Sequence, residues 1–408
     1  MSQPGKPILS FEDHSQNYWQ ITSIQSASVG IPGVLLGAQL TSTIGPLGAI
    51  SSILFGNLIL WMVGFTIISM AAPNRDNAIQ NVQRYIGKVG GMAAACLLIV
   101  AFLSWYILQI NTTVSIIQNA YTSIPTALRI GAAFGFLTAL LSSGGIYFIK
   151  KFSLISFPIL CSMLVYLFII SDSPIDFSQP WVVSFSGTLA IFSGALAGMI
   201  NLPTFFRHSK SKADSYLGLS LMTIFSIFFQ IFPVLCGYTD LASFKSISAF
   251  SNFILIAFTI LSLVGINLVN IYFASAGWEM IFPHRVSSKE YIIVGLLGTM
   301  AYTFLQISSP MLFLENMANN FIASLGAVLL LAFLVTIIVK HRPRPLEKIV
   351  NISSWFFGGT IGTIAQVHTD PTSALIMSIS ASCVLFLSII FLEETVWATK
   401  KILSRTIR

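Results

Sequence analysis

The sequence predicts an all-α integral membrane protein with about 12 transmembrane helices. Of its 408 residues, 55% are hydrophobic and only 9% are charged, and the mean hydropathy is +0.83; soluble domains carry about 25% charged residues. The apolar residues are gathered in stretches of roughly 20, the length that a helix needs to cross a bilayer. The polar gaps between these stretches are short, so no separate soluble domain is expected.

The predicted spans follow one another along the whole chain. In order they are 20–42, 46–72, 90–118, 127–148, 152–171, 184–205, 215–238, 249–276, 291–308, 312–338, 350–367 and 372–396. The four cysteines stand singly inside these apolar segments without paired spacing, which indicates core residues rather than a disulfide or a metal site.

Basic residues orient the spans. All of the 21 Lys and Arg residues except Arg129 and Lys245 fall in alternate gaps or in the tails. Because cytoplasmic loops are enriched in Lys and Arg, both termini are predicted to be cytoplasmic. The net charge of +7 is explained by orientation and by anionic lipid, so no nucleic-acid partner is expected. The chain is assigned to the plasma membrane, or to the inner membrane of a bacterium.

The predicted organisation has five parts. They are a cytoplasmic tail at 1–19, five helices at 20–171, five inverted helices at 184–338, two helices at 350–396, and a second cytoplasmic tail at 397–408.

Two spans carry residues that interrupt helices. The run 26–33 in the first span includes Pro32, which lacks a backbone donor, and several glycines and serines. The sixth span has a corresponding run at 193–198, followed by Asn201 and Pro203. Interrupted helices at matching places in two halves of a chain indicate a transporter's binding site.

A glycine pair supports a five-plus-five inverted repeat. Gly33 and Gly37 in the first span match Gly194 and Gly198 in the sixth, and these two spans run in opposite directions. Such pairs also occur wherever two membrane helices pack closely, so close packing remains an alternative.

Uncharged polar groups inside the spans are the candidate solute contacts. Trp105 and Gln109 stand four residues apart in the third span, on one helix face. Asn270 in the eighth span and Gln39 in the first are amides in apolar surroundings, where an unpartnered amide is costly. An aromatic plane beside amides suits a flat heterocycle; helix packing and interhelical hydrogen bonds are the alternative.

Other chemistry is not expected. The carboxylates lie in loops or at helix ends, and the five His residues are all near the rims of the spans. No nucleophile, base and metal ligand share one depth, so we expect neither an enzyme nor a cofactor.

Several motifs together resemble the nucleobase-cation symporter-1 family. The exit of the sixth span, Asn201-Leu-Pro-Thr-Phe-Phe-Arg207-His-Ser-Lys210, is similar to that family's Asn-x-Pro-Asp-Phe-x-Arg signature. The third-span stretch from Ser104 to Gln109 and the pair Asn270 and Tyr272 also resemble family motifs. The resemblance covers about the first 290 residues, whereas the last four spans match only in number.

The resemblance implies a leucine-transporter-type fold and a substrate site. The third-span Trp105 would stack on a planar substrate, and Gln109, Gln39 and Asn270 would bond its edges. Phe192, the candidate for a second aromatic contact, and Gly194 would complete the site from the sixth span.

The resemblance also implies a gate and a cation site, and the sequence departs from the family at both. Asn201, Pro203 and Arg207 are the gating candidates, although Thr204 replaces the signature's Asp and Arg207 also suits simple topology anchoring. A coupling cation, sodium or a proton, would be held near the interruption of the first span. The candidates are Gly30, Ser28 and Ser262. Ser262 is the one hydroxyl within reach in the eighth span, where family members with a sodium site carry a pair of hydroxyl residues.

The sequence therefore predicts a secondary active transporter that imports a nucleobase or a related planar heterocycle by cation symport. The alternatives are an amino-acid permease on the same fold, because a broken helix also suits a carboxylate, and a non-concentrating channel or transport-inactive sensor. The expected partners are the solute and the lipid bilayer.

Overall fold

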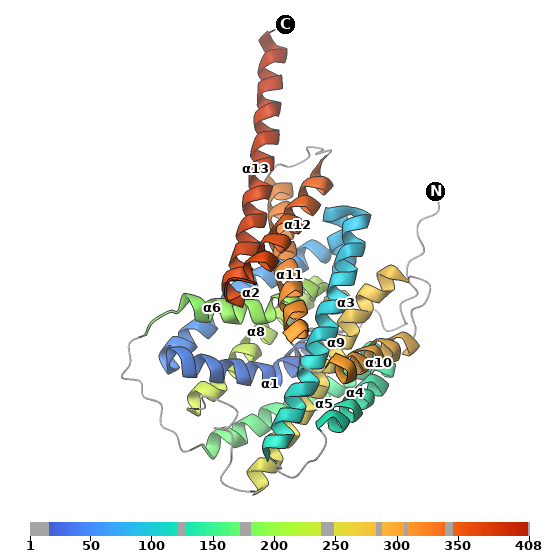
Figure 1. Cartoon of the computed structure of the whole chain (residues 1–408), viewed down its shortest axis with the longest axis vertical. Coiled ribbons are helices and arrows are strands. Elements are labelled where there is room, and N and C mark those ends of the chain that lie inside the picture. The colour runs from blue at the N-terminus through green and yellow to red at the C-terminus, as the bar shows by residue number, and fades with distance from the viewer. Residues whose placement is uncertain are drawn as a thin grey trace.

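The computed structural model describes residues 16–120, 127–171, 181–237, 249–282, 288–305, 309–338 and 346–406. Residues 1–15 of the predicted N-terminal tail and residues 407–408 of the C-terminal tail lie outside this set. The described residues form α-helices, because backbone groups surrounded by lipid must find their hydrogen bonds within the chain. Figure 1 shows these helices, which are α1 (Tyr18–Ile44), α2 (Pro46–Ala71), α3 (Ala78–Ala120), α4 (Ala127–Leu141), α5 (Gly145–Ile169), α6 (Phe185–Asn201), α7 (Pro203–Phe206), α8 (Lys212–Leu235), α9 (Ala249–Ile281), α10 (Ser288–Leu305), α11 (Ser309–Ile338), α12 (Glu347–Ala365) and α13 (Pro371–Thr406).

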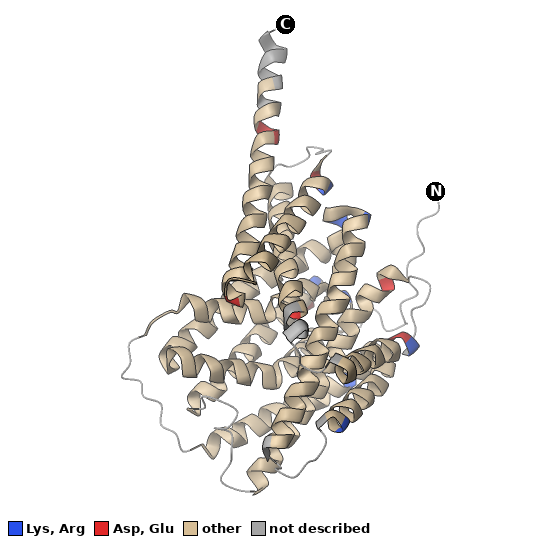
Figure 2. Cartoon of the chain, viewed as in Figure 1, with Lys and Arg blue, Asp and Glu red and all other residues tan. Residues whose placement is uncertain are grey.

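The helices correspond closely to the predicted spans. Nine helical stretches of the described residues are long and apolar enough to cross a membrane. One of them, Leu128–Ile169, contains two predicted spans, α4 and α5, joined by the short 3-10 helix η1 (Ser142–Gly144). Helices α10 and α12 occupy two further predicted spans without belonging to those nine. Figure 2 shows the charged residues mainly near helix ends. The chain is therefore a multi-pass membrane protein.

The helices pack as two groups of four. In the first group, α1 packs against α8, and α2 packs against α6 and α8; in the second, α3 packs against α9 and α4 against α10. These pairings agree with an inverted repeat in which α1–α5 correspond to α6, α8, α9, α10 and α11. The contacts α1 with α5 and α5 with α9 have their counterparts in α6 with α11 and α11 with α3. The predicted five-plus-five arrangement is confirmed.

Helix α1 is interrupted where the sequence predicts. Gly30 has non-helical dihedrals, with φ 6° and ψ −114°. At this break the Ile31 N–H donates to the Ser262 hydroxyl of α9, at 2.7 Å. A side chain at Gly30 would overlap the Ser262 hydroxyl, so glycine is needed for the close approach of α9.

The sixth span is interrupted later than the sequence suggests. Helix α6 continues without a break through residues 193–198 and ends at Asn201, after which the four-residue helix α7 begins at Pro203. Glycine is tolerated inside a helix, whereas proline in the first turn lacks a donor that is unused there. The change from α6 to α7 therefore lies at Leu202, whose dihedrals stay helical (φ −48°, ψ −40°) while its N–H bonds the Met199 carbonyl three residues back.

The two matching glycine pairs have different surroundings. A Cβ added at Gly37 would overlap the Gln230 carbonyl oxygen of α8, and one at Gly33 would lie 3.4 Å from Phe229. By contrast, an added Cβ at Gly198 meets nothing within 4 Å, and one at Gly194 meets only Leu36 at 3.8 Å. The first pair is a packing surface between α1 and α8, and the second faces open space.

Candidate functional site

A cavity of about 190 Å³ lies between helices of both four-helix groups. Its described lining comes from four helices: Trp105 on α3, Ser193 and Gly194 on α6, Glu315, Asn316, Asn319 and Asn320 on α11, and Pro371, Thr372 and Leu375 on α13. Pockets for drug-sized ligands usually measure about 300–1,000 Å³. This cavity has the size for a small solute, with one aromatic plane and several amides on its walls.

The structure brings together two of the six predicted substrate contacts. Trp105 and Gly194 line the cavity from opposite helix groups. Phe192 is half-buried and packs on the main apolar core. Gln109 is buried one helical turn beyond Trp105, with 4% of its surface exposed.

Like Phe192 and Gln109, the last two predicted contacts, Asn270 and Gln39, do not belong to the described cavity lining. Asn270 is buried on α9, which packs along α3, and its amide nitrogen has no hydrogen-bond partner among the described residues. Both amide atoms of Asn267, one turn earlier, are buried and unpartnered within the same set. Gln39 is exposed on α1, and its backbone carbonyl accepts from the hydroxyls of Ser42 and Thr43.

The candidate cation-binding residues lie around the break in α1. Gly30 and Ser262 are in direct contact across α1 and α9. Ser28 is half-buried and donates its hydroxyl to the Gln25 carbonyl at 2.6 Å. The Ala27 carbonyl oxygen lies 3.3 Å from the position that a Cβ of Gly265 would take. Carbonyl and hydroxyl oxygens thus gather at a helix interruption, the kind of site that holds a small cation in transporters.

Arg207, predicted as a gating residue or a topology anchor, is buried within a polar cluster. Its guanidinium lies 3.6 Å from Glu279 of α9 and donates to the Tyr272 hydroxyl at 3.4 Å. The His208 ring nitrogen Nε2 lies 2.8 Å from that same hydroxyl. Burial opposes the charge on Arg207, but Tyr272 and Glu279 together hold its pKa above the usual value. The cluster fixes the segment after α7 to α9.

Asn201 and Pro203 lie directly before this cluster. The Thr204 hydroxyl donates to the Asn201 side-chain oxygen at 2.8 Å and accepts from the Ala78 N–H at 3.4 Å. Thr204, the departure from the family signature, thus provides an uncharged link between α7 and the start of α3.

The N-terminal segment is tied to the loop between α7 and α8. The Gln16 N–H donates to the His208 carbonyl at 3.0 Å, and the Lys210 N–H donates to the Gln16 carbonyl at 2.8 Å. The Tyr18 N–H also donates to the Asp214 carboxylate of α8, at 3.0 Å. We call this set of three hydrogen bonds the N-terminal clamp.

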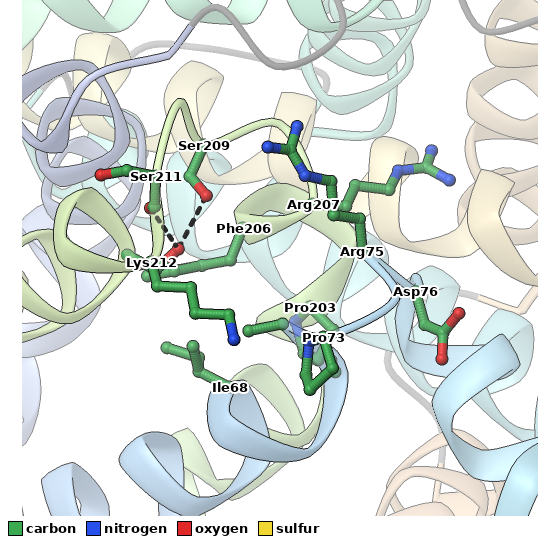
Figure 3. Close-up of a pocket in the computed structure, with 13 residues that line it drawn as sticks. Ile68, Pro73, Arg75, Asp76, Pro203, Phe206, Arg207, Ser209, Ser211 and Lys212 are labelled. Carbon is green, nitrogen blue, oxygen red and sulfur yellow. Dashed lines mark hydrogen bonds between the residues drawn. The ribbon is translucent and has the colours of Figure 1, made fainter.

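A second cavity of about 190 Å³ lies beside this loop. Its basic residues do not converge: Lys212 extends toward Ile68 and Pro203, whereas the side chains of Arg75 and Arg207 extend away on the other side (Figure 3). The cavity borders the predicted gate.

Sequence reasoning missed the polar wall of the first cavity. Glu315 lies at the start of the apolar part of α11, where it was classed with carboxylates at helix ends. Glu315 with Asn319 and Asn316 with Asn320 are two pairs four residues apart, and such pairs are neighbours on a helix, so the four side chains form one broad polar face. That spacing was the available signal.

No protein-family model and no curated protein matches this sequence. Solved structures do match its fold. The nucleobase-cation-symport-1 family transporter Mhp1, in a closed conformation with bromovinylhydantoin bound, is 13% identical over 96% of this chain and 97% of that chain, with a TM-score of 0.69. A substrate-bound, outward-open Na⁺-coupled sialic acid symporter is 12% identical over 91% of this chain and 88% of that chain, with a TM-score of 0.67.

A manganese transporter from Eremococcus coleocola is more distant, at 12% identity over 94% of this chain and 97% of that chain, with a TM-score of 0.55. Together these likenesses confirm the predicted leucine-transporter-type fold. One of the solved structures with this fold, Mhp1, belongs to the family that the sequence motifs resemble.

Proposed function

We propose that this protein is a secondary active transporter that imports a small planar nitrogenous solute, a nucleobase or a related heterocycle, by cation symport. The carrying observation is the small cavity whose described lining includes Trp105 of one helix group and Gly194 of the other. An aromatic ring and a residue without a side chain in the wall of one small cavity suit a flat ring as ligand. The sequence motifs and the hydantoin bound to Mhp1 support the same class of solute and a divergent position in that transporter's family.

The cavity's position supports alternating access. Helix α6 belongs to the group formed with α1, α2 and α8, whereas α3 packs with α9. A relative movement of the two groups would change the cavity walls and open it to one side at a time. Arg207, Asn201 and Pro203 would act at the end predicted to be cytoplasmic, beside the clamp and the buried polar cluster.

The proposed coupling site is the break in α1. The candidates are the carbonyl oxygens near Gly30 together with the hydroxyls of Ser262 and Ser28. Sodium is our first choice because the sialic acid symporter that shares this fold is Na⁺-coupled; a proton is the alternative.

The test is ligand-dependent thermal stability and uptake with the purified full-length protein. Nucleobases, hydantoins and amino acids are compared with and without sodium, because a ligand that binds only the folded state raises the melting temperature. Trp105→Ala should weaken binding of the stabilising base by about 1–3 kcal/mol, the value of one base–aromatic stack.

Trp61→Ala is the matched control, since Trp61 lies on α2 and donates to the Ser220 hydroxyl at 3.1 Å, outside the described cavity lining. Unchanged base binding in Trp105→Ala would remove the central claim. Stabilisation by amino acids alone would select a permease of that class, and a solute gradient that collapses without ever concentrating would select a channel.

A further inference from the structure

We propose that the Glu315 carboxylate accepts a hydrogen bond from an exocyclic amino group, or from an equivalent charged N–H group, on a planar solute whose ring lies against Trp105. This inference rests on the proposed function and narrows its substrate to amino-substituted heterocycles. Its basis is a carboxylate that shares one small cavity with the predicted stacking residue.

Glu315 is the one acidic or basic residue in the described cavity lining. Glu315 is half-buried at the start of the apolar part of α11, and no Lys, Arg or His belongs to the described cavity lining. Neither of the two ion pairs seen in the described part of the chain, Arg84 with Asp76 and Arg207 with Glu279, includes Glu315. A carboxylate inside a membrane protein normally pairs with a cation or with strong donors. A solute with N–H groups can supply these donors.

The neighbouring amides leave Glu315 available for this role. The Asn320 side-chain amide donates to the Gln366 side-chain oxygen at 3.0 Å. The backbone carbonyl of Asn320 accepts from the Ser378 hydroxyl of α13 at 2.7 Å. Asn319, one turn after Glu315, provides a hydrogen bond to its carboxyl group. These bonds hold the polar face of α11 in place, so the remaining carboxylate oxygen and Asn316 are the groups left to meet a ligand.

The combination of groups selects the ligand chemistry. A carboxylate accepts from the amino group of an aminopyrimidine, as Glu and Asp do with cytosine N4. The Trp105 ring adds a stacking surface that also attracts a cation over its face. An oxo group at the same ring position would instead place an acceptor against the carboxylate. The protein should therefore bind the amino member of a ring system more tightly than the oxo member.

The experiment measures binding of matched ligand pairs to the full-length protein in detergent. Cytosine is compared with uracil and adenine with hypoxanthine, by ligand-induced shifts in melting temperature and by titration. In the unsubstituted protein we expect the amino member of each pair to bind about tenfold or more tightly, the effect of one hydrogen bond to a charged group. In Glu315→Gln, which keeps the side chain's shape, this preference should fall to less than about threefold.

Asp370→Asn is the matched control. Asp370 precedes the cavity-lining Pro371, but its carboxylate is occupied by the Ser373 N–H at 3.0 Å and the Ser373 hydroxyl at 2.6 Å. The control removes the same charge near the cavity and retains a helix-capping side chain. It should keep the amino preference.

Each further outcome counts against the inference. Equal binding of the amino and oxo members, or a preference that survives Glu315→Gln, overturns it while the proposed transport function stands. Loss of the preference in Asp370→Asn as well would assign it to the general charge of the region instead of to Glu315. Binding of neither pair, with stabilisation by another solute class, would overturn both proposals.

Discussion

The two glycine pairs of the inverted repeat should respond oppositely to the same substitution. An alanine Cβ at Gly37 would overlap the Gln230 carbonyl oxygen and lie 2.8 Å from Pro233 Cγ, both on α8. Because the first clash is with backbone, no side-chain rotation relieves it, and α1 must move away from α8. Overpacking of this kind costs about 1–3 kcal/mol. It exceeds the gain of about 1 kcal/mol that alanine brings to a helix interior.

Gly198→Ala is the matched substitution at the corresponding place in α6. Since an added Cβ there meets nothing within 4 Å, only the helix-propensity gain remains, and stability should stay equal or rise by up to about 1 kcal/mol. The assay is reversible chemical unfolding of each purified variant in the same detergent, followed by circular dichroism. A loss of stability in Gly198→Ala as large as that in Gly37→Ala would refute the distinction between a packing surface and an open face.

Two further stability predictions concern the contacts between the helix groups. Glu279→Gln should destabilise the protein by about 3–5 kcal/mol, because it removes the carboxylate that lies 3.6 Å from the buried Arg207 charge. The double variant Arg207→Met/Glu279→Met should recover most of that loss. If it recovers nothing, the ion-pair explanation is contradicted. Ser262→Ala should cost about 1–3 kcal/mol, because the buried Ile31 N–H loses its acceptor. The unfolding midpoint reports this cost, and an unchanged midpoint would show that the break in α1 is not held by this bond.

Hydropathy and polar breakers predicted the fold well because the bilayer imposes simple requirements. Spans, helix order and the interruption at Gly30 follow from the need to bury apolar residues and satisfy every backbone group. The position of the second interruption did not follow. Gly194 and Gly198 resemble breakers in a sequence, but α6 runs through both and only Leu202 lies between α6 and α7. Flexible residues permit a break without requiring one.

The candidate site was predictable only in part. Trp105 is identifiable because an aromatic residue followed by an amide one turn later is conspicuous in an apolar helix. Gln39 has the same chemical character, yet it is exposed, because the direction of a side chain depends on the rotation of its helix against its neighbours. Glu315 was not singled out, because every carboxylate was predicted to lie in a loop or at a helix end. Its place in the cavity depends on α3 and α13 approaching α11 from distant parts of the sequence.

The N-terminal clamp has a mechanical consequence. Backbone hydrogen bonds join Gln16 to residues 208 and 210, and the Tyr18 N–H donates to the Asp214 carboxylate of α8. The half of α1 before Gly30 is thereby coupled to the segment that follows α7. Because these bonds tie the two segments directly, we expect a movement of one to carry the other with it. The non-helical Gly30 is the point in α1 at which such a movement could stop.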